Sequence, residues 1–241
     1  MSDVCIKTEA LASGAAERDP ALLNAFTVLT FSDLKKWAFY YWFAFPALKL
    51  PSPARVMGNP VTLADHASAD GAPGYAAAAA AKACDEWLSS GGASAWLLTI
   101  SGGGGGDAST SACACHPLTR FAELRDAGDN ARVVLAFADP CAAATHPGWA
   151  LRNLAVMASV RWGVEELHVL CVRRPGGRVS AAASLMLTLR LPTLSVDMSA
   201  PGAPCPPTVG WEANAKGRTG PRVADLVGRV TLTYVEFRFS V

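Results

Sequence analysis

The residues best able to do chemistry are cysteines and histidines in the middle of the chain. Cys113, Cys115 and His116 are close in sequence, and Cys84 is a further thiol that the fold could bring near them. Zinc prefers such ligands, but structural zinc sites usually combine two separate pairs with a C-x₂₋₄-C spacing. The spacing C-x-C-H departs from that pattern, and the sequence offers no second pair. We therefore expect no metal site.

Cys141 and His146, five residues apart, are a second candidate, as a nucleophile and its base. A reactive cysteine needs an electropositive neighbour, and its base needs a third group to orient it. No such third group is evident, so we expect Cys141 to be a buried structural thiol in a turn that starts a helix. No pair of carboxylates stands out either, and we assign no catalytic residue.

A run of five glycines, 102–106, is the third candidate, because glycine-rich loops can cradle phosphate groups. A phosphate-binding loop of this kind needs Lys and Ser or Thr after its last glycine, but Asp107 follows here. Its negative charge would repel phosphate. We expect residues 101–112 to form a flexible insertion and no cofactor to bind there.

Composition excludes several functional classes. The chain has 241 residues, of which 51% are hydrophobic and 17% charged, so it can bury a core and is not disordered. Its formal net charge is +1, without any block of like charge, which argues against a nucleic-acid partner. Seven cysteines without regular spacing and no secretory signal indicate the reducing cytosol.

The most aromatic part of the chain, 22–45, has apolar residues at spacings of three and four. This spacing predicts one helix, or two helices broken near Thr30, ending at Pro46. The apolar stretch 37–48 is shorter than the ~20 residues that cross a bilayer, so we expect no membrane insertion and a buried core element. The side chains expected in the core are Trp37, Tyr41, Trp42, Phe43 and Phe45, with Trp149, Leu151 and Leu154 in the same or a neighbouring core.

The rest of the chain interleaves predicted helices and strands. Helices are expected at 76–88, 117–126 and 149–162, and strands at 95–100, 132–138, 167–172, 184–191 and 231–239. Residues 1–20 lack a useful periodicity and are expected to form a loose leader, and 192–222 are expected to be extended. The order predicts an α+β fold, a mixed sheet flanked by helices.

Three blocks of sequence carry a family resemblance. They are Leu22–Phe26 with Leu29–Leu48, then Asp139–Cys141 with His146–Asn153 and Arg161-Trp162, and finally Val209–Asn214 with Lys216-Gly217 and Gly220–Arg222. Together they resemble the amino-terminal domain of autophagy-related protein 7, the E1-like activating enzyme of autophagy. The resemblance implies a domain at 21–222 that is incomplete at its start, followed by a divergent tail at 223–241.

The resemblance also implies a function. In this family the carboxy-terminal half, expected to be missing here, binds ATP and magnesium, contacts the ubiquitin-like modifiers and carries the thioester cysteine. The amino-terminal half is not a nucleotide-binding fold and docks E2-like conjugating enzymes, so that the modifier can be passed on for lipid conjugation. We accordingly expect a recruitment module that is inactive alone, located in the cytoplasm and at the preautophagosomal structure.

The docking residues are expected among the basic side chains of the third block, Lys216, Arg218 and Arg222. They lie on a Gly- and Pro-rich segment where packing demands little, and the conjugating enzymes of the family offer an acidic flexible segment. The alternative is that they are solvated loop charges. Two other functions stay open: an independent small enzyme using Cys141 or a phosphate site around 102–106, and a non-functional fragment of an incomplete gene model.

Overall fold

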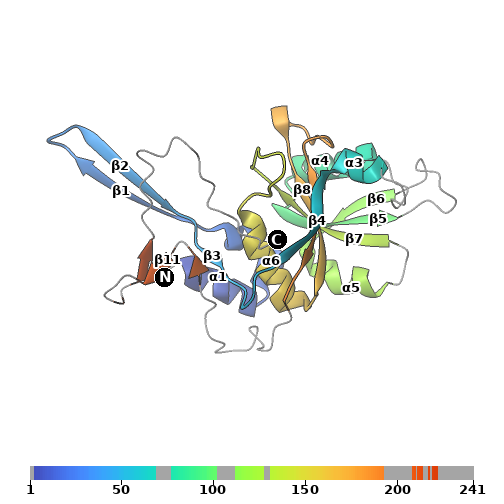
Figure 1. Ribbon diagram of the computed structural model, residues 1–241, viewed down its shortest axis with the longest axis horizontal. Helices are drawn as coiled ribbons and strands as arrows, with labels where there is room; N and C mark the ends of the chain where they lie inside the picture. The colour runs from blue at the N-terminus through green and yellow to red at the C-terminus, as the bar shows by residue number, and fades with distance from the viewer. Residues whose placement is uncertain are drawn as a thin grey trace.

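A six-stranded mixed sheet forms the centre of the protein (Figure 1). The structure is a computed structural model, and it describes residues 3–68, 77–101, 112–127, 131–192, 208–209, 211–213, 217 and 219–221. The strand order is β4-β9-β8-β7-β5-β6. The strands are β4 (Arg55–Thr62), β9 (Leu185–Arg190), β8 (Glu166–Val172), β7 (Ala131–Ala138), β5 (Ala95–Ser101) and β6 (Ala112–His116). β7 and β8 are parallel and the other neighbours are antiparallel. The predicted α+β class is confirmed.

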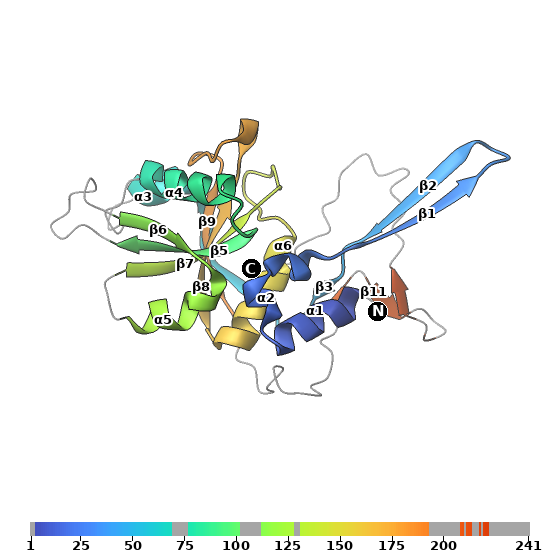
Figure 2. The ribbon, with the colours of Figure 1, turned by 180° about the vertical axis from the view of Figure 1, so that it is seen from behind.

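Helices cover both faces of this sheet (Figure 2). On one face lie α4 (Ala77–Ser89) and α3 (Leu63–Ser68). On the other lie α1 (Asp3–Ala12), α2 (Ala15–Arg18), α5 (Phe121–Asp126) and α6 (Ala150–Met157), with 3-10 turns at Pro20–Asn24 and Leu118–Arg120 and a π-helical turn at Ala158–Trp162. Successive side chains of a strand point to opposite faces, so β5 buries Leu97 on the α6 side and Trp96 and Leu98 on the α4 side.

The helices and strands expected between residues 76 and 191 are present within a few residues of their predicted bounds. Helix α4 shows why: its run of alanines favours a helix, and it stops at Ser89. Gly91 follows with a φ of 82°, the left-handed conformation that commonly ends a helix, and the Gly92 N–H bonds the Trp87 carbonyl.

The expected helix at 22–45 is wrong. Its residues form β1 (Thr27–Asp33) and β2 (Ala38–Ala44), an antiparallel hairpin that projects away from the body in both views (Figures 1 and 2). Trp37 is 84% exposed and Phe45 is 41% exposed, so neither is in the core. The side chains of Tyr41, Trp42 and Phe43 are outside the described set. Val, Thr and aromatic residues favour strands, which outweighed the helical spacing.

Residues 3–18 are not a loose leader but the helices α1 and α2. Ala10, Leu11 and Ala16 are buried in the core on the α6 side. Small alanines let these short helices pack closely, so a weak apolar pattern is enough to dock them.

Several expectations lie outside the described residues, namely the insertion at 102–111, most of 193–222, and the tail at 223–241 with its expected strand. The described parts of the carboxy-terminal region are β10 (Thr208–Val209), which pairs with β3 (Ala47–Leu48), and the short pair β11 (Trp211–Ala213) and β12 (Thr219–Pro221). In the described part of the chain, each helix is too short or too polar to cross a bilayer.

Candidate functional site

Buried polar contacts hold the β1–β2 hairpin to the body of the protein. The hairpin is taken here as residues 25–46, which includes the two residues before β1 and the two after β2. The Lys7 side chain is fully buried, and its Nζ donates hydrogen bonds to the carbonyl oxygens of Ala25 (2.6 Å) and Pro46 (2.9 Å). Ala25 precedes β1 and Pro46 follows β2. One ammonium group of α1 therefore joins the two ends of the hairpin.

Asn153 of α6 fixes the same region from the other side. Its buried Nδ2 donates to the carbonyl oxygens of Leu23 (2.7 Å) and Pro46 (3.5 Å). Its Oδ1 accepts a hydrogen bond from the Leu48 N–H at 2.8 Å. Without Asn153 the Leu23 carbonyl and the Leu48 N–H would lose this partner, and an unpaired buried polar group costs about 1–3 kcal/mol.

Aromatic rings complete the base of the hairpin. The Phe26 and Phe45 rings stack with centroids 5.0 Å apart, and the Phe45 ring lies 5.2 Å from that of Trp149. Trp149 stands at the first turn of α6. Because the hairpin ends contact both α1 and α6, its direction relative to the body is fixed.

The rest of the hairpin exposes apolar side chains. The large exposed ones are Phe26, Val28, Leu29, Phe31, Leu34, Trp37, Phe39, Tyr40 and Phe45. Neighbours in a strand point to opposite faces, so exposure at both Phe39 and Tyr40 means that neither face is covered by the described residues. An exposed apolar patch of this kind marks an interaction surface, and an isolated two-stranded hairpin is marginally stable alone.

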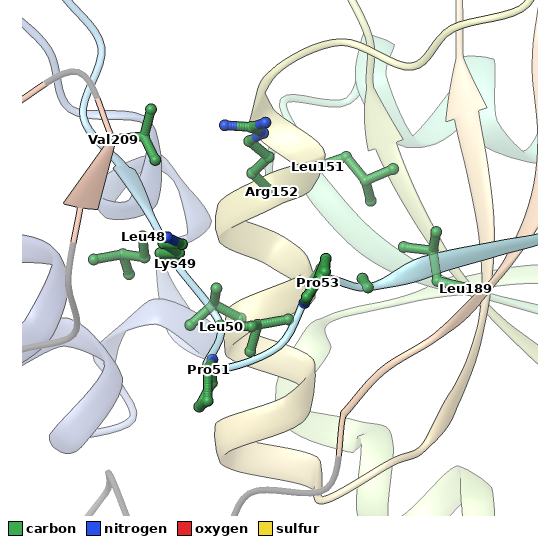
Figure 3. Close-up of a pocket in the computed structure, with 12 residues that line it drawn as sticks. Leu48, Lys49, Leu50, Pro51, Pro53, Leu151, Arg152, Leu189 and Val209 are labelled. Atoms are coloured by element: carbon green, nitrogen blue, oxygen red, sulfur yellow. The ribbon is translucent and has the colours of Figure 1, made fainter. Parts of the chain in front are cut away.

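An apolar groove of about 370 Å³ lies beside the hairpin base (Figure 3). It runs between α6 and the segment 48–54 that links β3 to β4, and Leu189 and Val209 complete its lining. The described charged residues that line it are Lys49 and Arg152, both basic. Burial lowers the pKa of Arg152 from its usual value. The groove therefore offers an apolar floor with positive charge.

Cys141 and His146 lie on a loop that hydrogen bonds from Arg173 hold in place. Buried Arg173 pairs with buried Asp139 at 3.1 Å and donates to the carbonyl oxygens of Ala143 and His146, each at 2.6 Å. The half-buried Cys141 places its sulfur 3.4 Å from the Ala143 N–H, from which it accepts a hydrogen bond. These contacts shape the loop and give it a structural role.

Gly148 shows how tightly this loop is packed. A Cβ at this position would lie 2.1 Å from Oδ1 of Asp139, which is closer than real contacts allow. The same Oδ1 accepts a hydrogen bond from the Cys141 N–H at 3.0 Å. Glycine is therefore required for the loop to reach the buried carboxylate.

The histidine near the other cysteines is engaged elsewhere. His116 contacts the Thr99 hydroxyl through Nε2 (3.0 Å) and the Arg120 guanidinium through Nδ1 (2.9 Å). Burial and the Arg120 charge lower its pKa. Among the residues that the structure describes, no group of three His, Cys, Asp or Glu could hold a metal ion.

Lys216, Arg218 and Arg222 lie outside the described residues, so their docking role stays a prediction. The surface that sequence reasoning missed is the hairpin. Two runs rich in β-branched and aromatic residues, separated by Leu34-Lys35-Lys36-Trp37, were its signal.

Comparison with known proteins gives the family. The sequence family described as the N-terminus of the ubiquitin-like modifier-activating enzyme ATG7 matches residues 4–229. This chain belongs to the ATG7 amino-terminal family. The match confirms the resemblance found in the sequence, and it includes most of the two helices before residue 20.

Relatives include the ATG7 enzymes of Gallus gallus, 37% identical over 223 residues, and Mus musculus, 34% identical over 224 residues. These alignments cover 90% and 91% of this chain but 29% and 30% of the enzymes, so the chain spans about a third of their length. A solved structure of the Kluyveromyces marxianus Atg7NTD–Atg10 complex aligns with a TM-score of 0.46 and 15% identity. It covers 90% of this chain and 63% of that one.

Proposed function

We propose that this chain is the recruitment module of an E1-like autophagy activating enzyme. It docks E2-like conjugating enzymes, so that the ubiquitin-like modifier can be passed on for lipid conjugation. Membership of the ATG7 amino-terminal family supports the proposal. The observation that carries it is the β1–β2 hairpin, an exposed apolar arm with a fixed base.

The fixed base matters because binding loses less entropy when the contact surface is already ordered. The arm is joined to α1 through Lys7 and to α6 through Asn153 and Trp149. It therefore presents Phe31 and Phe39 in a set direction without a folding step on association. Aromatic side chains of this kind are frequent hot spots of protein interfaces.

The chemistry of modifier activation belongs, in this proposed division, to the rest of the activating enzyme. ATP, magnesium, the modifier and the thioester cysteine are assigned there, and the cytoplasm, including the preautophagosomal structure, is the proposed location. In this chain the braced position of Cys141 supports a structural role for its loop. Incubation with ATP, magnesium and the modifier tests this division, because an adenylate or thioester formed on this chain alone would contradict it.

Calorimetric titration with an E2-like autophagy conjugating enzyme tests the docking arm. Register places Phe31 opposite Tyr40 on one face and Phe39 opposite Ser32 on the other. Phe31→Ser combined with Tyr40→Ser, and Phe39→Ser alone, therefore test the two faces separately. Loss of one anchor should weaken binding at least about tenfold.

Met57→Ser is the matched control, because Met57 is 45% exposed on β4 and outside the arm. It should leave the affinity unchanged. If neither face of the arm affects affinity while the variants stay folded, the arm is not the docking surface.

The basic residues of the third block are proposed to steer an acidic segment of the partner. Reversal of Lys216, Arg218 and Arg222 to Glu should slow association and weaken its dependence on salt. Unchanged affinity at low and high salt would indicate solvated loop charges.

A further inference from the structure

Three thiols gather under helix α4 at β6, the last strand in the order of the central sheet. Cys113 and Cys115 are two residues apart in β6, so both point to the face that α4 covers. Cys84 of α4 is fully buried in the same cluster. The thiols of Cys84 and Cys115 interact closely enough to shift each other's pKa, and neither is in a disulfide.

The two sulfurs have different protonation preferences. The hydrogen bond from Cys84 lowers the pKa of Cys115, and the same bond, together with burial, raises the pKa of Cys84. Cys115 is thus the sulfur of the pair that more readily becomes a thiolate. The thiolate is the form that reacts with oxidants.

Trp96 of β5 supports the same assignment. Its fully buried indole nitrogen has no conventional hydrogen-bond partner within the described part of the chain. Trp96 belongs to the same buried cluster as the thiols, and its N–H lowers the pKa of both Cys84 and Cys115. A buried donor without an oxygen acceptor is unusual, and this one lies in the cluster that holds the thiol pair.

The two thiols also differ in access. Cys115 is half-buried on the sheet's last strand, whereas Cys84 is fully covered. Of the two residues, Cys115 is therefore the one that a small oxidant can approach, and Cys84 lies in the same buried cluster. An accessible thiol of low pKa beside a second, resolving thiol is the arrangement of redox-sensitive cysteines.

We propose that Cys84 and Cys115 form a peroxide-sensitive thiol pair that oxidises to a disulfide between α4 and β6. The Cys115 thiolate attacks one oxygen of hydrogen peroxide, the O–O bond breaks, and hydroxide leaves and takes up a proton as water. The resulting sulfenic acid is attacked by the Cys84 sulfur, which loses its proton as the S–O bond breaks and a second water leaves. Two thiols are oxidised and one peroxide is reduced to two waters.

The disulfide would close a loop from residue 84 to residue 115 that contains β5. It would fasten the last strand to the helix above it, and a dithiol reductant would reverse it. The thiol pair is therefore a modification site separate from the docking arm. Its oxidation can be followed by the protection of β6 amides from hydrogen exchange.

The test is peroxide treatment of the full chain, followed by mapping of cross-linked peptides and amide hydrogen exchange. We expect a Cys84–Cys115 peptide, loss of two free thiols, slower exchange in β6, and full reversal by dithiothreitol. Cys113→Ser is the matched control on the same face of the same strand, and it should form the same cross-link. Cys115→Ser should abolish it.

Other results overturn the proposal. They are a disulfide that joins other cysteines, a Cys115 that proceeds to sulfinic acid while Cys84 stays reduced, or no loss of either thiol at peroxide concentrations that oxidise a free cysteine. Because Cys84→Ser places a hydroxyl in the core, Cys84→Ala is the variant for this position. It should leave Cys115 oxidised without a cross-link.

Discussion

Lys7 and Asn153 donate hydrogen bonds to the same carbonyl oxygen, that of Pro46, at 2.9 and 3.5 Å. Lys7 belongs to α1 and Asn153 to α6, so residues 146 positions apart in sequence meet where β2 ends. This shared acceptor fixes the docking arm to the core. The amino-terminal helix, unremarkable in its sequence pattern, is therefore part of the apparatus that positions the arm.

Asn153→Ala should destabilise the protein by about 2–4 kcal/mol, because it leaves the Leu48 N–H and the Leu23 carbonyl buried without this partner. Denaturant unfolding measures this. Asn24→Ala is the control, since Oδ1 of Asn24 has no hydrogen-bond partner in the described structure, and it should cost much less. Equal losses for the two variants would remove Asn153 from its anchoring role.

Asp139→Ala should destabilise by about 3–5 kcal/mol, because it leaves the buried guanidinium of Arg173 without its counter-charge. Asp126→Ala removes an ion pair with Arg125 in which both side chains are more than half exposed, so its effect on stability should be far smaller. Thermal unfolding of both variants measures the two losses of stability. A loss below about 1 kcal/mol for Asp139→Ala would show that the loop does not depend on the pair.

Stability should fall as the solution is acidified below the ordinary histidine pKa of 6.5. Burial is the largest cause that lowers the pKa of His66, His116 and His168 in the folded protein. Over the range between the ordinary and the lowered pKa, the unfolded chain binds more protons, so stability decreases with decreasing pH.

His168 provides the test of this dependence. It lies near Arg132, whose charge further lowers the pKa, and near Glu166, whose charge opposes the shift. His168→Gln should make unfolding midpoints at pH 7.5 and 5.5 more alike. His146→Gln, at an exposed side chain, is the control and should keep the original difference. If His168→Gln keeps it too, His168 does not contribute.

Between residues 77 and 191 the sequence predicted most of the fold, because buried strands and amphipathic helices there follow the periodicity of one core. The helix α6 is an example, with Leu151 and Leu154 buried as expected. The same reasoning from periodicity gave the wrong secondary structure for the β1–β2 hairpin. Its exposed apolar residues occur on both faces, so their spacing reports no buried side and the inference of a helix had no physical basis.

The candidate site was less predictable than the fold. Sequence alone predicts a surface position for Lys7, because lysine is rarely buried. Its acceptors are backbone carbonyl groups, which no residue type in the sequence reveals. Cys84 and Cys115 are 31 positions apart, and their contact depends on how α4 crosses β6. Only tertiary structure could show either relationship.

Trp37 at the end of the hairpin turn offers a way to separate stability from docking. It has a φ of 51°, the left-handed conformation that favours glycine, and it is 84% exposed. Trp37→Gly relieves the backbone strain, whereas Trp37→Ala removes the same ring but keeps the Cβ. The Gly variant should therefore be more stable than the Ala variant by about 1 kcal/mol.

Amide exchange in β1 and β2 measures this difference locally, and titration with the conjugating enzyme measures docking. If the ring contacts the partner, both variants should bind more weakly by a similar factor, although their hairpins differ in stability. If affinity instead follows hairpin stability, the arm acts through its rigidity and the Trp37 ring is not a contact. Equal hairpin stability in the two variants would contradict strain at this turn.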